Sequence, residues 1–179
     1  MHVINTDFDE VKIIRHEKMF DKRGFRTTVF KKDTFEKIGF SFDIVEERIY
    51  CPQINAFFGI HFQNNPSSQN KLISLLSGVG LDFIIDLRRK SNTYKKWIKI
   101  ELNSNENLMI FIPHGFGHAF LSKSENVKIS YKIDEYHNEY SKAISYKDPE
   151  INLCIQINEE LISDQDKYAP FLKDSDCNL

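Results

Sequence analysis

The segment from Val79 to Arg88 constrains the fold of this chain most strongly, because its apolar and polar side chains alternate. One face of the segment is wholly apolar, and the other face carries Asp82, Asp86 and Arg88. An alternation with a period of two residues is typical of a β-strand with two different faces. In an open sheet the polar face would meet water, whereas in a barrel it could line a ligand cavity. The alternation therefore predicts a strand and leaves both environments open.

Short apolar segments recur along the chain. We expect extended segments at residues 11–16, 25–30, 42–50, 56–62, 71–76, 94–102, 108–112, 116–120, 127–133, 143–146 and 151–157. Residues 33–38 read as a short helix that is capped by Asp33 and ends at Gly39, and we expect the polar C-terminus to be frayed. Short strands at even spacing predict an all-β sandwich or barrel. Because no repeat or linker divides the chain, we expect one domain over residues 1–179.

The composition argues against several classes of partner. A net charge of -2 without a basic run gives no support for binding to nucleic acid or to a membrane surface. No apolar run approaches the roughly 20 residues of a membrane helix, and the N-terminus lacks the pattern of a secretory signal. The three cysteines, Cys51, Cys154 and Cys177, are widely scattered and suggest neither a disulfide framework nor a zinc ribbon. These features predict a cytoplasmic protein with no nucleic-acid or membrane partner.

A histidine and a lysine flank a turn in the middle of the chain. His61 lies in an apolar segment, the turn Asn-Asn-Pro-Ser-Ser follows it, and Lys71 opens the next apolar segment. Apolar neighbours disfavour the charged forms of both side chains, which can bring a base and an electrophile near neutral pH. Taken alone, the segment is better described as a hairpin with a half-buried histidine and a solvated lysine.

Nine short motifs follow one another from about Phe20 to Pro170. They are Asp21-x-Arg23-Gly24, Gly59-Ile60-His61-x-Gln63, Gln69-x-Lys71-Leu72, Asp82-x-x-x-Asp86-x-Arg88, Ser91-x-Thr93-x-x-x-Trp97, Ile112-Pro113-x-Gly115-Phe116-x-His118-x-Phe120, Tyr131-Lys132, Asp148-Pro149 and Leu161-Ile162-Ser163-x-x-Asp166. In this order they resemble the deoxysugar-nucleotide epimerases typified by dTDP-4-dehydrorhamnose 3,5-epimerase. The resemblance implies an all-β, cupin-type jelly-roll barrel with short peripheral helices. It also implies a homodimer that holds no metal.

The resemblance assigns four catalytic roles. His61 matches the general base, and Asp166 matches the carboxylate that orients the base and raises its basicity. Lys71 matches the lysine that stabilises negative charge on the carbonyl oxygen of the sugar. Tyr136 is our match for the tyrosine that supplies a proton from the opposite face of the sugar ring. That match requires one deleted residue, and His137 is the alternative without the deletion.

Five further residues are expected to bind the substrate. Asp82 and His118 match residues that line the sugar pocket of the family, and Gln63 belongs to the motif around His61. Arg23 is expected to be one of the cations nearest the ligand. The expectation that Arg48 binds the substrate has a different basis, because it rests on positions where the chain departs from the family pattern.

Three positions depart from that pattern. The family usually has an arginine before the glycine of Gly-x-His, and this chain has Phe58 there. The usual Gln-x-Asn-x-Ser pattern is replaced by residues 46–50, and the usual glutamate after the Arg-Gly turn is Thr28. In relatives these positions contact mainly the nucleotide and the diphosphate. We therefore expect a rebuilt nucleotide site in which Arg48 replaces the lost arginine, unless Arg48 is paired with a neighbouring glutamate.

The predicted activity is inversion of C3, C5 or both in a 4-keto-6-deoxy sugar nucleotide, such as a dTDP sugar, for surface-polysaccharide biosynthesis. Because the ketone itself is the electron sink, we expect no cofactor, and the chain has no Rossmann, P-loop or nucleophile-elbow motif. The alternatives are a C3-only epimerase, a cupin that acts on another nucleotide-linked keto sugar, and a non-catalytic sugar-nucleotide-binding cupin. A metal-dependent cupin would need a His-x-His pair, but Phe62 and Gln63 follow His61.

Overall fold

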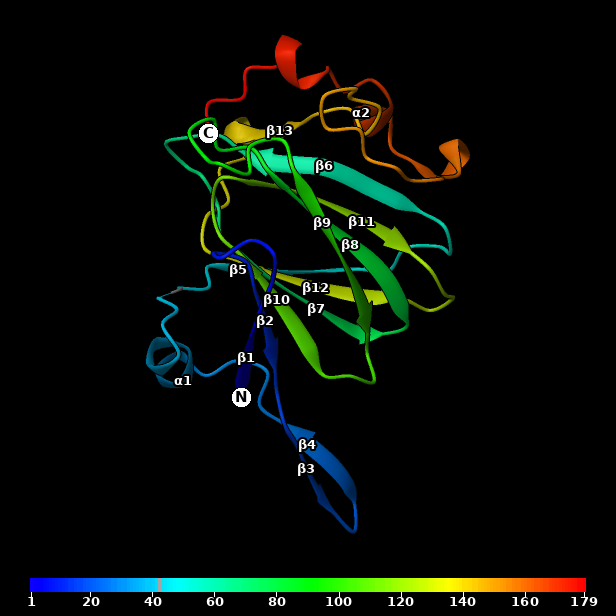
Figure 1. Cartoon of the computed structure of the whole chain (residues 1–179). Helices are drawn as coiled ribbons and strands as arrows, with labels where there is room; N and C mark the ends of the chain where they lie inside the picture. The colour runs from blue at the N-terminus through cyan, green and yellow to red at the C-terminus, as the bar shows by residue number, and fades with distance from the viewer. Residues whose placement is uncertain (42) are drawn as a thin grey trace.

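A computed structural model describes residues 1–41 and 43–179, and two facing β-sheets form the body of the fold (Figure 1). In sheet order, the six strands of the first sheet are β1 (His2–Asn5), β2 (Lys12–Arg15), β10 (Leu108–Ile112), β7 (Lys71–Ser77), β12 (Lys128–Ile133) and β5 (Glu46–Tyr50). The five strands of the second sheet are β13 (Ser141–Ala143), β6 (Phe57–Gln63), β11 (Phe116–Ser122), β8 (Val79–Asp86) and β9 (Trp97–Asn103). All pairs within both sheets are antiparallel.

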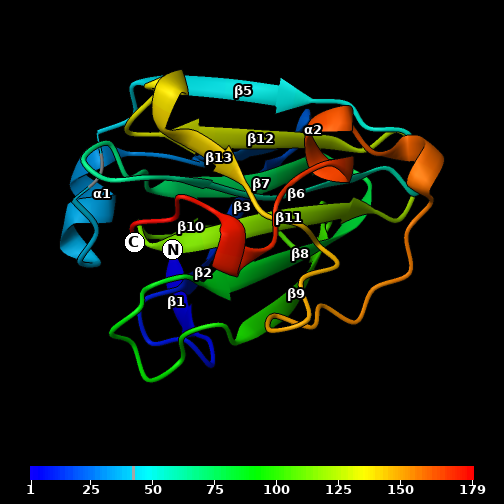
Figure 2. The ribbon, with the colours of Figure 1, turned by 90° about the horizontal axis from the view of Figure 1, so that it is seen from above.

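The chain alternates between the two sheets as it runs from β5 to β13, except that β8 and β9 are neighbours in the second sheet. This crossing between sheets is the topology of a jelly roll. In Figure 1 the two sheets lie one above the other, and Figure 2 looks down on them so that they overlap. The described strands do not join into one closed ring. The predicted all-β jelly-roll class is thus confirmed, as two facing sheets.

Strand β8 shows why the alternation in the sequence was ambiguous, because both of its faces are buried. Ile84 and Asp82 face the space between the sheets, where Ile84 joins the inner core. Phe83 and Ile85 face outward and pack under the C-terminal segment, with Leu153 among their partners. The polar face of this strand therefore lines the interior of the fold.

The C-terminal segment covers the outer face of the second sheet (Figure 1). Residues 151–157, which we expected to form a strand, pack their apolar side chains on the sheet without joining its hydrogen-bond ladder. The end of the chain is also ordered, contrary to expectation. Cys177 is buried, and the Asn65 backbone N–H donates to the Asn178 side chain over 2.8 Å, while the Asn178 N–H donates to Asn64 over 3.1 Å.

Helix α1 (Lys32–Lys37) covers the outer face of the first sheet. Its Phe35 is buried against Ile14 and Met109 of that sheet. The helix ends before Gly39 as expected, but it begins one residue early, so Asp33 lies inside the first turn and does not cap it. The remaining short elements are α2 (Asp164–Lys167) and the 3-10 turns Asn138–Tyr140, Glu159–Leu161 and Leu172–Asp174.

A two-stranded hairpin, β3 (Lys18–Asp21) and β4 (Gly24–Thr27), projects away from both sheets (Figure 1). Its apolar side chains are exposed, and Phe20 reaches 75% exposure. The expected strand at 25–30 therefore ends at Thr27, and the strand expected at 42–50 begins at Glu46, with Phe42 outside the described residues. No helix in the described part of the chain is long and apolar enough to cross a membrane.

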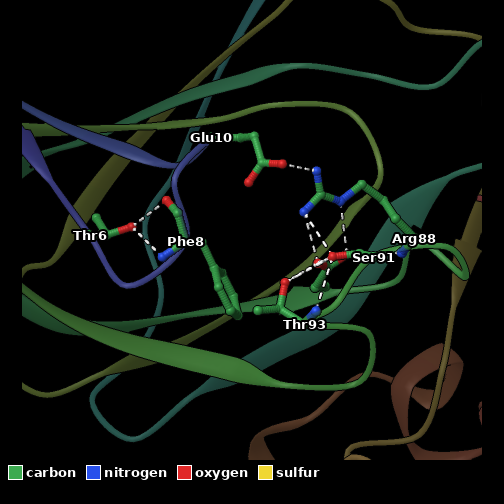
Figure 3. Close-up of polar contacts among 7 residues, drawn as sticks. Thr6, Phe8, Glu10, Arg88, Ser91 and Thr93 are labelled. Atoms are coloured by element: carbon green, nitrogen blue, oxygen red, sulfur yellow. Dashed lines mark hydrogen bonds and ion pairs between the residues drawn. The ribbon is translucent and has the colours of Figure 1, made fainter.

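The loop after β8 is tied to the N-terminal segment by one arginine (Figure 3). Arg88 donates to Asp86 over 2.9 Å and 2.8 Å and to Glu10, and its guanidinium lies 4.4 Å from the centre of the Phe116 ring. The hydroxyls of Ser91 and Thr93 also donate to Asp86, each over 2.6 Å. The second carboxylate of the Asp-x-x-x-Asp-x-Arg motif thus stabilises a loop, whereas the first points into the site described below.

Candidate active site

A cavity of about 240 Å³ lies between the two sheets. Its walls come mainly from β5, β12 and β7 on one side and from β6 and β11 on the other. The lining combines aromatic and aliphatic side chains with a few polar ones, namely Arg48, Tyr50, Phe58, His61, Phe62, Gln63, Gln69, Lys71, His118, Ile129, Tyr131, Ile133, Ser141 and Gln165. A concave, largely apolar site with a few convergent polar groups is typical of a small-molecule site.

A β-bulge in β6 turns His61 into this cavity. His61 faces His118 of β11, and Phe58 faces Phe120, so three steps along β6 match two along β11. Without the extra residue, strict alternation from Phe58 would turn His61 to the outer face. Gly59 sits in the bulge at φ +114, and a Cβ there would lie 2.6 Å from the His118 carbonyl oxygen. Only glycine fits this position without displacing the neighbouring strand.

Asp166 of α2 holds both the histidine and the bulge. Its Oδ1 lies 2.6 Å from Nε2 of His61, and its Oδ2 accepts the Gly59 backbone N–H over 3.1 Å. Burial alone would raise the pKa of Asp166, but the hydrogen bonds from His61, Gly59 and Ser163 lower it below its usual value. The carboxylate is therefore ionised and favours the tautomer with the proton on Nε2. The basic nitrogen of His61 is then Nδ1.

A second buried acid–histidine pair lies beside the first. Both carboxylate oxygens of Asp82 are 2.9 Å from Nε2 of His118; the hydrogen bond goes to Oδ2, and Oδ1 has no partner among the described residues. Burial raises the pKa of Asp82, although His118 and Lys71 oppose the shift. Both residues lie on the inner face of the second sheet, where His118 lines the cavity, whereas Asp82 is fully buried and is not among the lining residues.

Lys71 is the deepest cation of the cavity. It opens β7 and is only 7% exposed. Burial lowers its pKa to about 8, against the attraction of Asp134 and Asp82. At pH 7 most of the lysine is therefore protonated, and it presents a poorly hydrated ammonium to the cavity.

The structure contradicts the expected position of the proton-donating tyrosine. Tyr136 follows the end of β12, is 54% exposed, stacks on His137 and does not line the cavity. His137, the alternative, is also largely exposed, between Glu135 and Glu139.

Tyr131 lines the cavity instead, on the inner face of β12. It packs edge-on against His118 and Tyr50, at 5.4 Å and 5.2 Å between ring centres. Burial and then the Asp82 carboxylate raise its pKa well above the usual value, so the phenol keeps its proton. The sequence held a signal for this residue, because Tyr131 alternates with Ser130 and Lys132 and so shares a face with the apolar Ile129 and Ile133.

The predicted substrate-binding residues divide into two groups. Gln63 lies in the cavity wall, where its side chain donates to the Ser67 carbonyl. Arg48 also lines the cavity, but Glu46 holds its guanidinium over 2.5 Å and 2.9 Å, which is the pairing that we considered as the alternative. Arg23 lies at the tip of the β3–β4 hairpin, paired with Asp21 over 2.6 Å and 81% exposed. Arg23 is therefore not part of the cavity of its own chain.

The two histidines of the cavity are each paired with a carboxylate. His61 and His118 lie opposite each other, but each ring gives its Nε2 to a carboxylate. Within residues 1–41 and 43–179, no three His, Cys, Asp or Glu side chains form a group that could hold a metal ion.

Comparisons with known proteins show the family of the chain. The family model described as dTDP-4-dehydrorhamnose 3,5-epimerase matches residues 5–174. An epimerase of that name from Methanothermobacter thermautotrophicus is 32% identical over 98% of this chain and 97% of its own length. A Streptomyces protein, 29% identical over 85% of this chain and 79% of its own, is named dTDP-4-dehydro-6-deoxyglucose 3-epimerase.

Solved structures resemble the whole fold. The dTDP-6-deoxy-D-glucose-3,5-epimerase of Legionella pneumophila, in complex with dTDP-4-keto-L-rhamnose, has a TM-score of 0.89 and 31% identity over 96% of this chain and 93% of that chain. The dTDP-4-dehydrorhamnose 3,5-epimerase of Bacillus anthracis, with TDP and pyrophosphate bound, has a TM-score of 0.90 and 30% identity over 96% of this chain and 99% of that chain. The chain therefore belongs to the dTDP-4-dehydrorhamnose 3,5-epimerase family and is an isomerase.

Proposed function

We propose that this chain inverts C3, C5 or both in a 4-keto-6-deoxy sugar nucleotide, by removing and returning a proton beside the ketone. The observation that carries the proposal is the arrangement of one cavity. A carboxylate-bound histidine lies on one wall, and a buried lysine and a protonated tyrosine lie on the other. Binding alone would not need this set, which argues against a non-catalytic sugar-binding cupin.

In this proposal His61 removes the proton. The 4-keto group acidifies the hydrogens of C3 and C5, and Nδ1 of His61 accepts one of them while Asp166 stabilises the imidazolium that forms. Electron density moves onto the ketone oxygen, where the ammonium of Lys71 stabilises the negative charge in a poorly hydrated site. The ketone acts as the electron sink, so the chemistry needs no cofactor.

Tyr131 returns the proton from the other side. It belongs to the first sheet and His61 to the second, so a sugar ring between the sheets would have the two groups on opposite faces. Because the phenol keeps its proton, it can donate to the carbanion-like intermediate and then regain a proton from solvent, while His61 releases to solvent the proton that it removed. Inversion results when the proton leaves toward one sheet and arrives from the other.

Solvent-deuterium exchange tests the proposal. Wild-type protein is incubated in D₂O with the 4-keto-6-deoxyglucose derivatives of dTDP, UDP, GDP and CDP, and label is read separately at C3 and C5 by NMR. We expect label at C3, or at both carbons, with at least one substrate, and none with His61→Ala. The separate reading distinguishes a 3,5-epimerase from a 3-epimerase such as the Streptomyces relative. Label in His61→Ala at the wild-type rate would contradict the assignment of the base.

A homodimer is part of the proposal, because Arg23 cannot reach its own cavity. The hairpin that carries Arg23 projects from the sheets and exposes Met19, Phe20 and Phe25, at 47%, 75% and 56%. Exposed aromatic side chains on a projecting arm favour contact with another protein surface. We place the arm against a second copy of the chain, where Arg23 would approach the partner's cavity and its sugar nucleotide.

We also propose that the chain forms one domain and is cytoplasmic. We treat residues 1–179 as one domain, because the terminal segments pack on the outer faces of the two sheets. A cytoplasmic location is supported by the free thiols of Cys51, Cys154 and Cys177. In that compartment the product would supply deoxysugar for surface-polysaccharide biosynthesis.

A further inference from the structure

Arg48 of β5 lines the cavity and is bound by Glu46 of the same strand, in a contact that the catalytic steps above do not use. β5 is the edge strand of the first sheet, next to β12. Arg48 pairs in register with Tyr131, and Glu46 pairs with Ile133, which in turn pairs with Lys71. Glu46 therefore lies in the same cross-strand row as Lys71, two strands away, or about 10 Å.

The two side chains meet edge to edge. Nε and Nη2 of Arg48 donate to the two carboxylate oxygens of Glu46 over 2.5 Å and 2.9 Å. This two-point geometry is also the one in which arginine binds a phosphate group. The carboxylate thus occupies the Nε–Nη2 edge of the guanidinium, which is one of the two edges through which arginine can bind an anion by two hydrogen bonds.

The contact between Glu46 and Arg48 lowers the net positive charge that the cavity offers to an anion. Arg48 and Lys71 are the cations among the residues that line the cavity, and Glu46 compensates the first of them. The diphosphate of a sugar nucleotide carries at least two negative charges, and of these two lining cations only Lys71 forms no salt bridge with a described side chain. Both partners are partly exposed, at 40% for Arg48 and 35% for Glu46, so water weakens the pair and an incoming anion can exchange with it.

We infer that Glu46 is a specificity-determining residue that competes with the substrate's diphosphate for Arg48. The inference rests on the proposed function, because it takes a sugar nucleotide as the ligand of this cavity. Glu46 weakens the binding of any ligand that offers only a diphosphate. The cavity thereby depends more on contacts to the sugar and on its aromatic wall of Tyr50, Phe58 and Tyr131.

The neighbouring Glu47 provides a matched control. It lies on the same strand but points to the other face, where it accepts hydrogen bonds from Lys132 over 2.7 Å and from Ser130 over 2.6 Å. Glu47→Gln therefore removes the same charge from the same strand without freeing Arg48. Glu46→Gln keeps the size of the side chain and one acceptor oxygen, and a second variant, Glu46→Ser, removes both oxygens of the carboxylate.

The experiment compares four proteins, namely wild type, Glu46→Gln, Arg48→Ala and the double variant. Calorimetry measures the Kd of each protein for dTDP, UDP, GDP and CDP, and thymidine serves as an uncharged probe. Glu46→Gln should lower the Kd of the tightest diphosphate by about threefold to fivefold, as expected for a partly exposed charge pair. Arg48→Ala should raise that Kd, and the double variant should match Arg48→Ala. All four proteins should bind thymidine with the same Kd, and Glu47→Gln should bind the diphosphates as tightly as wild type does. In turnover, Glu46→Gln should lower KM and leave kcat unchanged.

The outcomes separate this inference from the proposed function. If wild type binds a diphosphate but Glu46→Gln binds it equally or more weakly, Glu46 does not compete and the inference is wrong. If Glu46→Gln lowers the Kd of the diphosphate even when Arg48 is replaced by alanine, the inference is also wrong. If neither wild type nor Glu46→Gln binds any of the four diphosphates, yet wild type exchanges deuterium into a sugar nucleotide, the inference alone fails. If neither binding nor exchange occurs, the proposed function fails as well.

Discussion

At the scale of single residues, the site depends on charges whose surroundings set their protonation. Asp166 is ionised because three donors offset its burial, Lys71 has a lowered pKa because burial outweighs its acidic neighbours, and Tyr131 keeps its proton because burial and Asp82 disfavour a phenolate. These shifts have different causes, and each leads to a separate expectation for activity.

Replacing Asp166 by asparagine should impair catalysis far more than folding. The amide keeps the size of the side chain but removes the charge that stabilises the imidazolium, so we expect kcat to fall about 10²- to 10⁴-fold. Asp164→Asn, on the exposed side of the same short helix, is the control and should keep wild-type kcat. Steady-state rates with the sugar nucleotide measure both; a less than fivefold loss in Asp166→Asn would contradict the role of the pair.

Lys71 should produce an alkaline limb in the pH profile. The ammonium is needed to stabilise the oxyanion, so kcat/KM should fall as pH rises through about 8, the pKa of the buried lysine. Stability should move in the opposite direction. Because the pKa in the folded protein lies below the usual 10.5, the unfolded chain binds more protons between about pH 8 and 10.5, and Lys71 destabilises the fold less as pH rises.

Rates measured from pH 6 to 10, together with unfolding curves over the same range, check both signs. Lys71→Met should lower activity at every pH and remove the gain in stability above pH 8. A wild-type profile that stays flat to pH 9.5 would show that the charge of Lys71 does not take part.

At the scale of elements, the break in β6 positions the base. Gly59→Ala would place a methyl group against the His118 carbonyl and the backbone of Ala119, at a φ that alanine rarely adopts. We expect a loss of about 1–3 kcal/mol in stability and, because His61 would shift, a loss of roughly 10²-fold in kcat. Gly39→Ala has a similar positive φ with open space around it, so it should lose stability without losing kcat. Equal kcat in Gly59→Ala and wild type would contradict the argument.

The strands were largely predictable because the alternation of side chains survives wherever one face of a strand is buried. The sequence could not show that both faces of β8 are covered, since the cover comes from a C-terminal segment that forms no regular ladder. It also could not show the bulge at Gly59, because a bulge changes the register of a strand without changing its composition.

The error over the tyrosine had a different origin. The assignment of Tyr136 relied on the spacing after Tyr131-Lys132 with one supposed deletion, and a count of that kind ignores which face of the strand a residue occupies. Strand β12 ends at Ile133, so Tyr136 lies beyond it, and Tyr131 is the aromatic residue of that strand on its inner face. Lys71 and Asp82 lie within strands that the alternation of side chains predicts, whereas His61 faces the cavity only because of the bulge at Gly59.

At the scale of the whole molecule, the projecting arm predicts a dimer with shared sites. Light scattering after size exclusion should give twice the mass of the chain. Arg23→Ala and His61→Ala should each be impaired, and their re-associated mixture should regain about a quarter of wild-type activity, because half the dimers are mixed and each has one intact site of two. A monomeric wild type, or a mixture no more active than its components, would contradict shared sites.

The central claim is that two sheets approach one carbon from opposite sides, with His61 removing a proton and Tyr131 returning one. The most direct test follows deuterium uptake and inversion together in Tyr131→Phe and Tyr136→Phe. We predict that Tyr131→Phe still exchanges the proton at C3 or C5 but does not invert the centre, whereas Tyr136→Phe does both at the wild-type rate. Inversion at the wild-type rate by Tyr131→Phe, or its loss in Tyr136→Phe, would contradict the account.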